Sequence, residues 1–143
     1  MDRLLHMGLD VGSTTVKLVV LDKNDKIKYS KYQRHFSDIR KTIYELVDET
    51  CAIFDGDDLT VTLTGSGGIS VAQWLGLPFE QEVVAAAGAV EKLIPHTDVA
   101  IELGGEDAKI TFFRGGIEQR MNGTCAGGTG AFIDQMASLL ETD

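Results

Sequence analysis

The chain has 143 residues, of which 43% are hydrophobic, and a formal net charge of −9 at pH 7. This length allows one ordinary domain, or one lobe with part of another. The acidic balance excludes broad, non-specific nucleic-acid binding, but backbone N–H groups and single lysines can still hold a nucleotide. Its two cysteines, Cys51 and Cys125, are too few for a disulfide scaffold, and no apolar run approaches the roughly 20 residues of a bilayer span. We therefore expect a cytoplasmic protein that binds neither nucleic acid nor membranes.

The first part of the chain predicts a sheet with accompanying helices. Apolar periodicity and turn residues place strands at 7–11, 16–21, 26–33 and 59–64, and helices at 37–54, 69–75 and 82–94. Ser37 is a candidate N-cap of the long helix. On that helix Cys51 is expected to be a small packing residue, and Trp74 is expected to pack in the core or against a lobe.

The second part begins with the same kind of sequence. Strands are expected at 99–103, 110–113 and 117–121, followed by an amphipathic helix that begins near Gly130. The fold class is therefore α/β, with a complete first lobe at 1–96 and the start of a second lobe at 97–143. By symmetry the second lobe lacks about fifty residues, so we expect the chain to be a fragment of a longer protein.

A hidden repeat relates the two parts at an offset of 92 positions. In each copy an acidic residue stands two before a glycine, and a lysine follows that glycine by five. The copies are Asp10-Val11-Gly12-Ser13-Thr14-Thr15-Val16-Lys17 and Glu102-Leu103-Gly104-Gly105-Glu106-Asp107-Ala108-Lys109. Each predicts a β-hairpin with a glycine turn, whose N–H groups can bind phosphate while the acidic residue holds Mg²⁺ through water. An ordinary hairpin explains one copy, but two matched copies point to related lobes that face a shared nucleotide.

Cys125 lies in a glycine-rich segment directly before the last predicted helix. A thiolate at a helix start is stabilised by the macrodipole and by unpaired N–H groups. The pattern therefore suits a nucleophile or an iron–sulfur ligand, although a buried cysteine in a glycine-rich turn has the same sequence.

These motifs together resemble the 2-hydroxyacyl-CoA dehydratase activators and the related ATPase subunits of benzoyl-CoA reductases. The resemblance rests on both repeat copies, on Thr64-Gly65-Ser66-Gly67 and on Asn122-Gly123-Thr124-Cys125-Ala126-Gly127-Gly128-Thr129-Gly130. It covers nearly the whole chain and is closest to the N-terminal activase domain of long, multi-domain members. It implies a ribonuclease H-like, actin-type ATPase fold, shared with sugar kinases and heat-shock chaperone ATPases.

The resemblance also implies a function and a set of site residues. Family members are ATP-dependent electron donors in anaerobes: homodimers that share one [4Fe-4S] cluster and pass an electron to the iron–sulfur protein of an acyl-CoA dehydratase or reductase. Cys125 matches a cluster ligand, and Glu106 and Asp107 are candidates for the catalytic base or a Mg²⁺ contact, or are plain turn carboxylates. The residues matched to ATP and Mg²⁺ binding are Asp10, Gly12, Ser13, Thr14, Thr15, Lys17, Gly104, Gly105 and Lys109, of which the two lysines are equally compatible with solvated strand positions.

The family pattern also needs a second cluster cysteine and an adenine-binding segment, which lie outside this sequence. We therefore expect the fragment alone to be inactive. Two other functions fit the residues: a metal-free kinase or ATPase of the same superfamily, and a non-enzymatic nucleotide-sensing domain.

Overall fold

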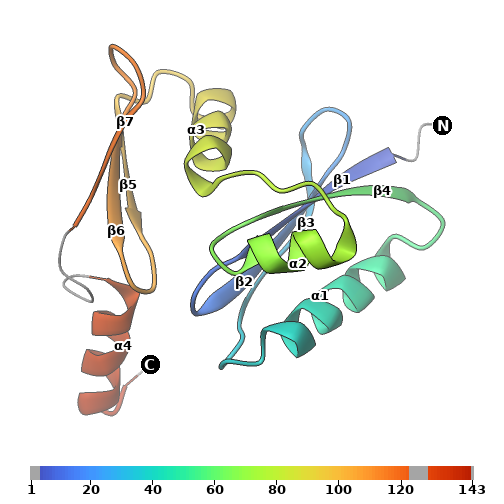
Figure 1. Ribbon diagram of the computed structural model, residues 1–143, viewed down its shortest axis with the longest axis horizontal. Coiled ribbons are helices and arrows are strands. Elements are labelled where there is room, and N and C mark those ends of the chain that lie inside the picture. The colour runs from blue at the N-terminus through green and yellow to red at the C-terminus, as the bar shows by residue number, and fades with distance from the viewer. Residues whose placement is uncertain (1–3, 123–128, 143) are drawn as a thin grey trace. The chain divides into compact units, whose positions relative to one another are not determined.

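The computed structural model describes residues 4–122 and 129–142 (Figure 1). The chain divides into two compact units, Met1–Glu82 and Val83–Asp143, and each unit has a sheet of its own. The expected α/β class is confirmed by this mixture of strands and helices. The lobe boundary expected between residues 96 and 97 stays a prediction.

The first unit is built on a four-stranded sheet with the strand order β3–β2–β1–β4. Its strands are β1 (Leu4–Val11), β2 (Thr15–Leu21), β3 (Ile27–Arg34) and β4 (Asp58–Thr64). β1 pairs antiparallel with β2 and parallel with β4. The carboxyl ends of β1 and β4 therefore lie side by side, next to the turn that joins β1 to β2.

One face of this sheet carries the hydrophobic core. The alternating core residues of the two central strands are Met7, Leu9, Val11, Val16, Leu18 and Val20. Helices α1 (Ile39–Ile53) and α2 (Gly68–Leu75) pack against this core through Leu46 and Ala72 (Figure 1). Because side chains alternate along a strand, Asp10, Lys17 and Thr64 lie on the opposite face of the sheet.

The start of α1 differs in one residue from the sequence prediction. Its N-cap is Asp38, whose side chain accepts a hydrogen bond from the Lys41 amide at 3.2 Å. Ser37 precedes the cap with a φ of 68° and is therefore not the capping residue. The helix itself is confirmed, and Leu46 and Thr50 on its inner face are fully buried.

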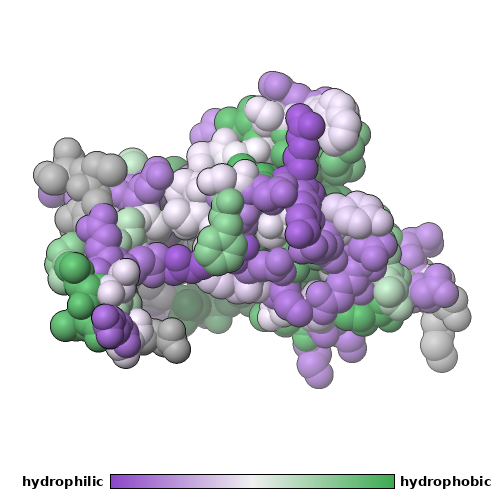
Figure 2. Space-filling model, turned by 90° about the horizontal axis from the view of Figure 1, so that it is seen from below, coloured by the Kyte–Doolittle hydropathy of each residue, from purple (hydrophilic) through white to green (hydrophobic). Residues whose placement is uncertain are grey.

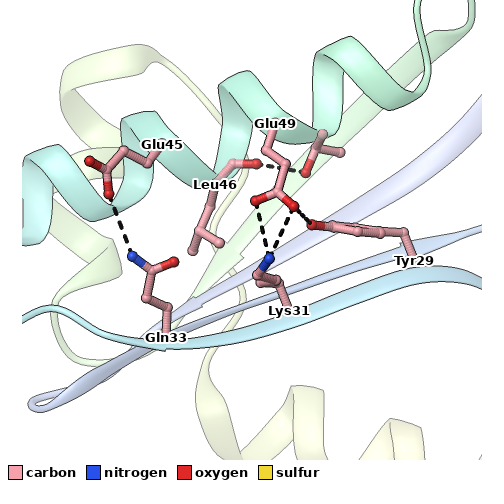
Figure 3. Close-up of polar contacts among 7 residues, drawn as sticks. Tyr29, Lys31, Gln33, Glu45, Leu46 and Glu49 are labelled. Carbon is pink, nitrogen blue, oxygen red and sulfur yellow. Dashed lines mark hydrogen bonds and ion pairs between the residues drawn. The ribbon is translucent and has the colours of Figure 1, made fainter.

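A polar cluster joins β3 to the side of α1 that faces it (Figure 3). Glu49 Oε1 accepts hydrogen bonds from the Tyr29 hydroxyl at 2.8 Å and from Lys31 Nζ at 3.0 Å. One turn earlier on the helix, Gln33 Nε2 donates a hydrogen bond to Glu45 Oε2 at 3.5 Å. The bond from Tyr29, followed by that from Lys31, lowers the pKa of the Glu49 carboxyl below its usual 4.5.

Glu49→Gln is expected to lower the thermal stability of the protein slightly at neutral pH, because exposed pairs contribute little. The folded-state pKa of Glu49 is depressed, so its contribution is present above the unfolded-state pKa and is lost as the pH falls through the folded-state value. Melting curves between pH 7 and pH 3 should therefore converge for the variant and the wild type. Glu91→Gln on an exposed helix position is the control, and a constant difference at every pH would contradict the assignment.

The second unit contains a three-stranded antiparallel sheet with the order β5–β6–β7. Its elements are α3 (Glu82–Leu93), β5 (Val99–Leu103), β6 (Ala108–Phe112), β7 (Glu118–Met121) and α4 (Gly130–Leu139). All of these elements were expected from the sequence.

Across residues 4–122 and 129–142, no helix has the length and apolarity that a bilayer crossing requires. On the face shown in Figure 2, hydrophobic residues are interspersed among hydrophilic ones instead of forming one continuous surface.

Candidate functional site

The first candidate site is the turn between β1 and β2. The Gly12 amide donates to the Thr15 carbonyl at 2.9 Å and closes the turn around Ser13 and Thr14. Asp10 and Lys17 are direct cross-strand partners, and Lys17 Nζ contacts Asp10 Oδ2 at 2.8 Å. The turn thus places hydroxyls, a lysine and a carboxylate around one glycine, as a phosphate and cation site requires.

The turn between β5 and β6 repeats this geometry. Here the Gly104 amide donates to the Asp107 carbonyl at 2.8 Å. Glu102 and Lys109 are direct cross-strand partners, with their charged groups 3.9 Å apart. Each of these positions lies 92 residues after its counterpart in the first hairpin, so the sequence repeat is also a repeat of backbone hydrogen bonding.

The charged residues of the two hairpins differ in exposure. The Lys17 side chain is 46% exposed, whereas that of Lys109 is only 8% exposed and lies 3.6 Å from Asp107 Oδ2. Asp107 therefore belongs to the ion pairs that hold its own hairpin together. Glu106 is exposed at the tip of the turn, and its carboxylate is the more accessible of the two candidate catalytic groups.

The turn that follows β4 closes against the first hairpin. The Gly67 amide donates to the Val11 carbonyl at 2.9 Å. Gly65 has a φ of +91°, and a Cβ there would lie 2.4 Å from Val11 O and 2.5 Å from Asp10 Oδ1. Gly65 is thus a site residue, and sequence reasoning assigned it no role beyond its place in a motif, because this approach joins segments over fifty residues apart.

His35 is a second residue that the sequence did not assign to the site. It is buried, its amide donates to the Thr14 carbonyl at 3.2 Å, and its ring Nε2 lies 3.2 Å from the Gly12 carbonyl. The Ser37 amide donates to Nδ1 at 3.1 Å, so the proton resides on Nε2, which donates to Gly12. A single histidine that lacks the spacing of a metal-binding motif carries no sequence signal for these contacts with the first turn.

The second hairpin is connected to the start of α4. The Gly130 amide donates to the Gly104 carbonyl and the Ala131 amide to the Gly105 carbonyl, both at 2.9 Å. Thr129, the N-cap residue, is fully buried. The predicted cluster ligand Cys125 lies outside the described residues.

The residues present fit a hydrated divalent cation at the first hairpin. Within the described ranges no three His, Cys, Asp or Glu residues form a cluster that would hold a bare metal ion. Asp10 Oδ1, however, is buried and has no hydrogen-bond partner among the described residues. A carboxylate oxygen of this kind suits Mg²⁺, which keeps several of its waters and binds through one or two carboxylates and the substrate phosphates.

A separate cavity of about 540 Å³ lies between α1 and α2. Its lining includes Cys51 and Trp74 but no residue of the first hairpin. Two expectations are corrected here: Cys51 is exposed and does not pack in the core, and Trp74 is 78% exposed. Both face this cavity, and the Arg40 guanidinium lies 5.9 Å from the centre of the Trp74 ring.

The family of the chain follows from sequence comparison. The sequence model of the BadF/BadG/BcrA/BcrD ATPase family matches residues 7–143. The chain belongs to this family. The resemblance drawn from the motifs is thereby confirmed, and the two glycine turns are features of a BadF/BadG/BcrA/BcrD ATPase sequence.

Curated relatives narrow the comparison within the BadF/BadG/BcrA/BcrD family. The chain is 31% identical over 143 residues to the 2-hydroxyisocaproyl-CoA dehydratase activator of Clostridioides difficile, covering 96% of this chain and 53% of the relative. It is 28% identical to the (R)-2-hydroxyglutaryl-CoA dehydratase activating ATPase of Acidaminococcus fermentans, covering 94% and 53%. The chain thus spans about half the length of the curated relatives it matches.

Solved structures agree with this placement. The Acidaminococcus fermentans (R)-2-hydroxyglutaryl-CoA dehydratase component A superposes with a TM-score of 0.80 at 27% identity, covering 98% of this chain and 55% of that one. The activator of the 2-hydroxyisocaproyl-CoA dehydratase from Clostridium difficile, solved with bound ADPNP, gives 0.75 at 30% identity, covering 97% and 53%. The actin-type ATPase fold expected for this BadF/BadG/BcrA/BcrD member is confirmed.

Proposed function

We propose that this chain is the ATP-binding part of an ATP-dependent iron–sulfur activase that donates a low-potential electron to an acyl-CoA dehydratase or reductase. The observation that carries the proposal is the pair of glycine turns with the same hydrogen bonds, Gly12 to Thr15 and Gly104 to Asp107. The family membership and the relatives named as dehydratase activators support it.

The two hairpins bind the nucleotide phosphates in this proposal. Backbone N–H groups near Gly12 and the hydroxyls of Ser13, Thr14 and Thr15 form one phosphate site, and the turn at Gly104 and Gly105 forms the other. Lys17 and Lys109 add positive charge at the two strand ends. The nucleotide-bound neighbour, solved with ADPNP, supports this assignment.

Two acidic residues have separate roles in this proposal: Asp10 binds Mg²⁺ and Glu106 orients the attacking water. Asp10 binds the hydrated Mg²⁺ through its unpartnered oxygen, and the cation neutralises phosphate charge when bound. Glu106, exposed at the turn, orients the water that attacks the γ-phosphate. Asp107 contributes mainly by holding Lys109 and the turn in place.

Cys125 supplies a thiolate to a [4Fe-4S] cluster shared by the two subunits of a homodimer. Such a cluster supplies one-electron chemistry at a potential that charge and hydrogen bonds around it tune. The amides of Gly130 and Ala131 join the second turn to the first turn of α4, so a change at the turn moves the start of that helix. This connection is the physical route by which nucleotide state reaches the segment that contains Cys125.

Asp10→Asn tests the phosphate and cation part of the proposal. The substitution removes the charge that attracts Mg²⁺ but keeps the shape of the side chain, so the affinity of the intact protein for an ATP analogue should fall at least tenfold with Mg²⁺. Without Mg²⁺, in the presence of EDTA, the affinities of variant and wild type should be similar. Isothermal titration calorimetry measures both, and Asp55→Asn at an exposed turn after α1 is the control. Unchanged affinity of Asp10→Asn would remove the basis for a Mg²⁺-nucleotide site at this hairpin.

A further inference from the structure

Thr64 carries a second buried oxygen at the end of the sheet where Asp10 lies. Its Oγ1 is buried and, like Asp10 Oδ1, finds no hydrogen-bond partner among the residues that the structure describes. The two residues are direct partners in the parallel pairing of β1 and β4. Partners in register place their side chains on the same face of the sheet, so the two oxygens belong to one location.

Such a pair is unusual for a folded protein. Buried polar side-chain atoms almost always have a partner in the protein or in an ordered water, because an unmet group loses its hydration without replacement. Thr62, two residues earlier on the same strand and face, is exposed and has no such requirement. The partner missing at Thr64 and Asp10 is therefore expected to come from outside the chain.

The neighbouring turn packs closely on this location. Gly65 brings its main chain so close to Asp10 that a Cβ would lie 2.5 Å from Oδ1. Lys17 occupies only the other carboxylate oxygen, Oδ2. One oxygen of Asp10 is thus paired with a lysine, while the other is buried without a partner among the described residues, at the register position of Thr64.

We propose that Thr64 is a binding residue for the hydrated divalent cation that accompanies the nucleotide: its Oγ1 and Asp10 Oδ1 both contact water bound to that cation. A carboxylate oxygen accepts hydrogen bonds and a hydroxyl can accept or donate one, so a cation-bound water satisfies both orphaned atoms. Mg²⁺ suits this role because it retains several waters when bound to proteins. The assignment rests on the proposed nucleotide function and adds a residue to its cation site.

The test compares Thr64→Val, which keeps the shape and removes the hydroxyl, with Thr64→Ser, which keeps the hydroxyl. Thr62→Val is the matched control on the same strand and face. Two quantities are measured on the intact protein: the melting temperature in EDTA without nucleotide, and the affinity for a non-hydrolysable ATP analogue with Mg²⁺ and with EDTA.

Thr64→Val is expected to raise the melting temperature without ligand, because it removes an unsatisfied buried hydroxyl. The same variant should bind the Mg²⁺-analogue complex about three- to tenfold more weakly, the loss expected for one hydrogen bond, with no change in EDTA. Thr64→Ser and Thr62→Val should bind like the wild type.

Two results would overturn the inference. If Thr64→Val lowers the melting temperature without ligand and leaves Mg²⁺-dependent affinity unchanged, the hydroxyl is purely structural. If the wild type itself shows no Mg²⁺-dependent binding, the proposed nucleotide function fails and the cation assignment fails with it. The first result leaves the nucleotide function intact, so the two failures are distinguishable.

Discussion

Gly65→Ala is expected to abolish nucleotide binding and to lower the free energy of unfolding by at least about 3 kcal/mol. The added Cβ would stand 2.4 Å from the Val11 carbonyl oxygen and 2.5 Å from Asp10 Oδ1, distances that no real Cβ tolerates. The φ of +91° adds strain for any residue with a side chain. Relief requires β1 and the β4–α2 turn to separate, and that movement displaces Asp10.

Gly76→Ala provides the matched control for this prediction. Gly76 also has a positive φ, +66°, at the end of α2, but a Cβ there meets no atom within 4 Å. Gly76→Ala should lower the free energy of unfolding by only about 1 kcal/mol, the backbone penalty, and leave nucleotide affinity unchanged. Urea unfolding measures the stability of both variants, and calorimetry measures their nucleotide affinity. The comparison separates the cost of a positive φ from the cost of the steric clash at Gly65. Equal, small effects of the two substitutions would contradict the close packing of the turn against Asp10.

Cys125→Ala is expected to remove most of the iron from the intact protein purified without oxygen. Each [4Fe-4S] cluster needs four thiolates, and the loss of Cys125 from both subunits of a dimer takes away two of them. Nucleotide affinity should remain close to that of the wild type, because the phosphate residues are on the hairpins. Iron and acid-labile sulfide per subunit are the quantities to measure.

Cys51→Ala is the control for the cluster assignment. Cys51 lies exposed on α1 beside a separate cavity, so its removal should leave iron, sulfide and the visible spectrum unchanged. Iron retained equally by both variants would show that Cys125 is not a ligand. Loss of iron in Cys51→Ala instead would place the cluster in another part of the fold.

The hairpins could be predicted from the sequence because their signals are local. The spacing of acid, glycine and lysine within eight residues specifies both the turn and the cross-strand pairs, and the structure shows Asp10 facing Lys17 and Glu102 facing Lys109. Apolar periodicity likewise predicts the helix that the structure places at Ile39–Ile53.

Contacts between distant segments could not be predicted in this way. The approach of Gly65 to Asp10 and the brace of His35 on Gly12 depend on how β4 and the end of β3 meet the first turn. The pattern of a single sequence does not indicate which distant segments come into contact. Asp38 and not Ser37 is the N-cap of α1, because the helix begins one residue later than the sequence predicted.

The exposure of Cys51 and Trp74 also could not be predicted from the sequence. Cys51 and Trp74 are apolar enough to predict packing, yet both face the cavity between α1 and α2. The packing angle of two helices on a sheet decides which edge is covered, and that angle is a property of the whole unit.

The reduction potential of the cluster in the intact protein is the decisive measurement for the proposed activase function. It would be titrated under anaerobic conditions with Mg²⁺-ADP and then with a Mg²⁺-bound, non-hydrolysable ATP analogue. We expect an iron–sulfur signal whose potential is more negative with the ATP analogue, because the nucleotide acts through the second turn on the start of α4. An equal potential in both states, or no cluster to titrate, would contradict the proposal.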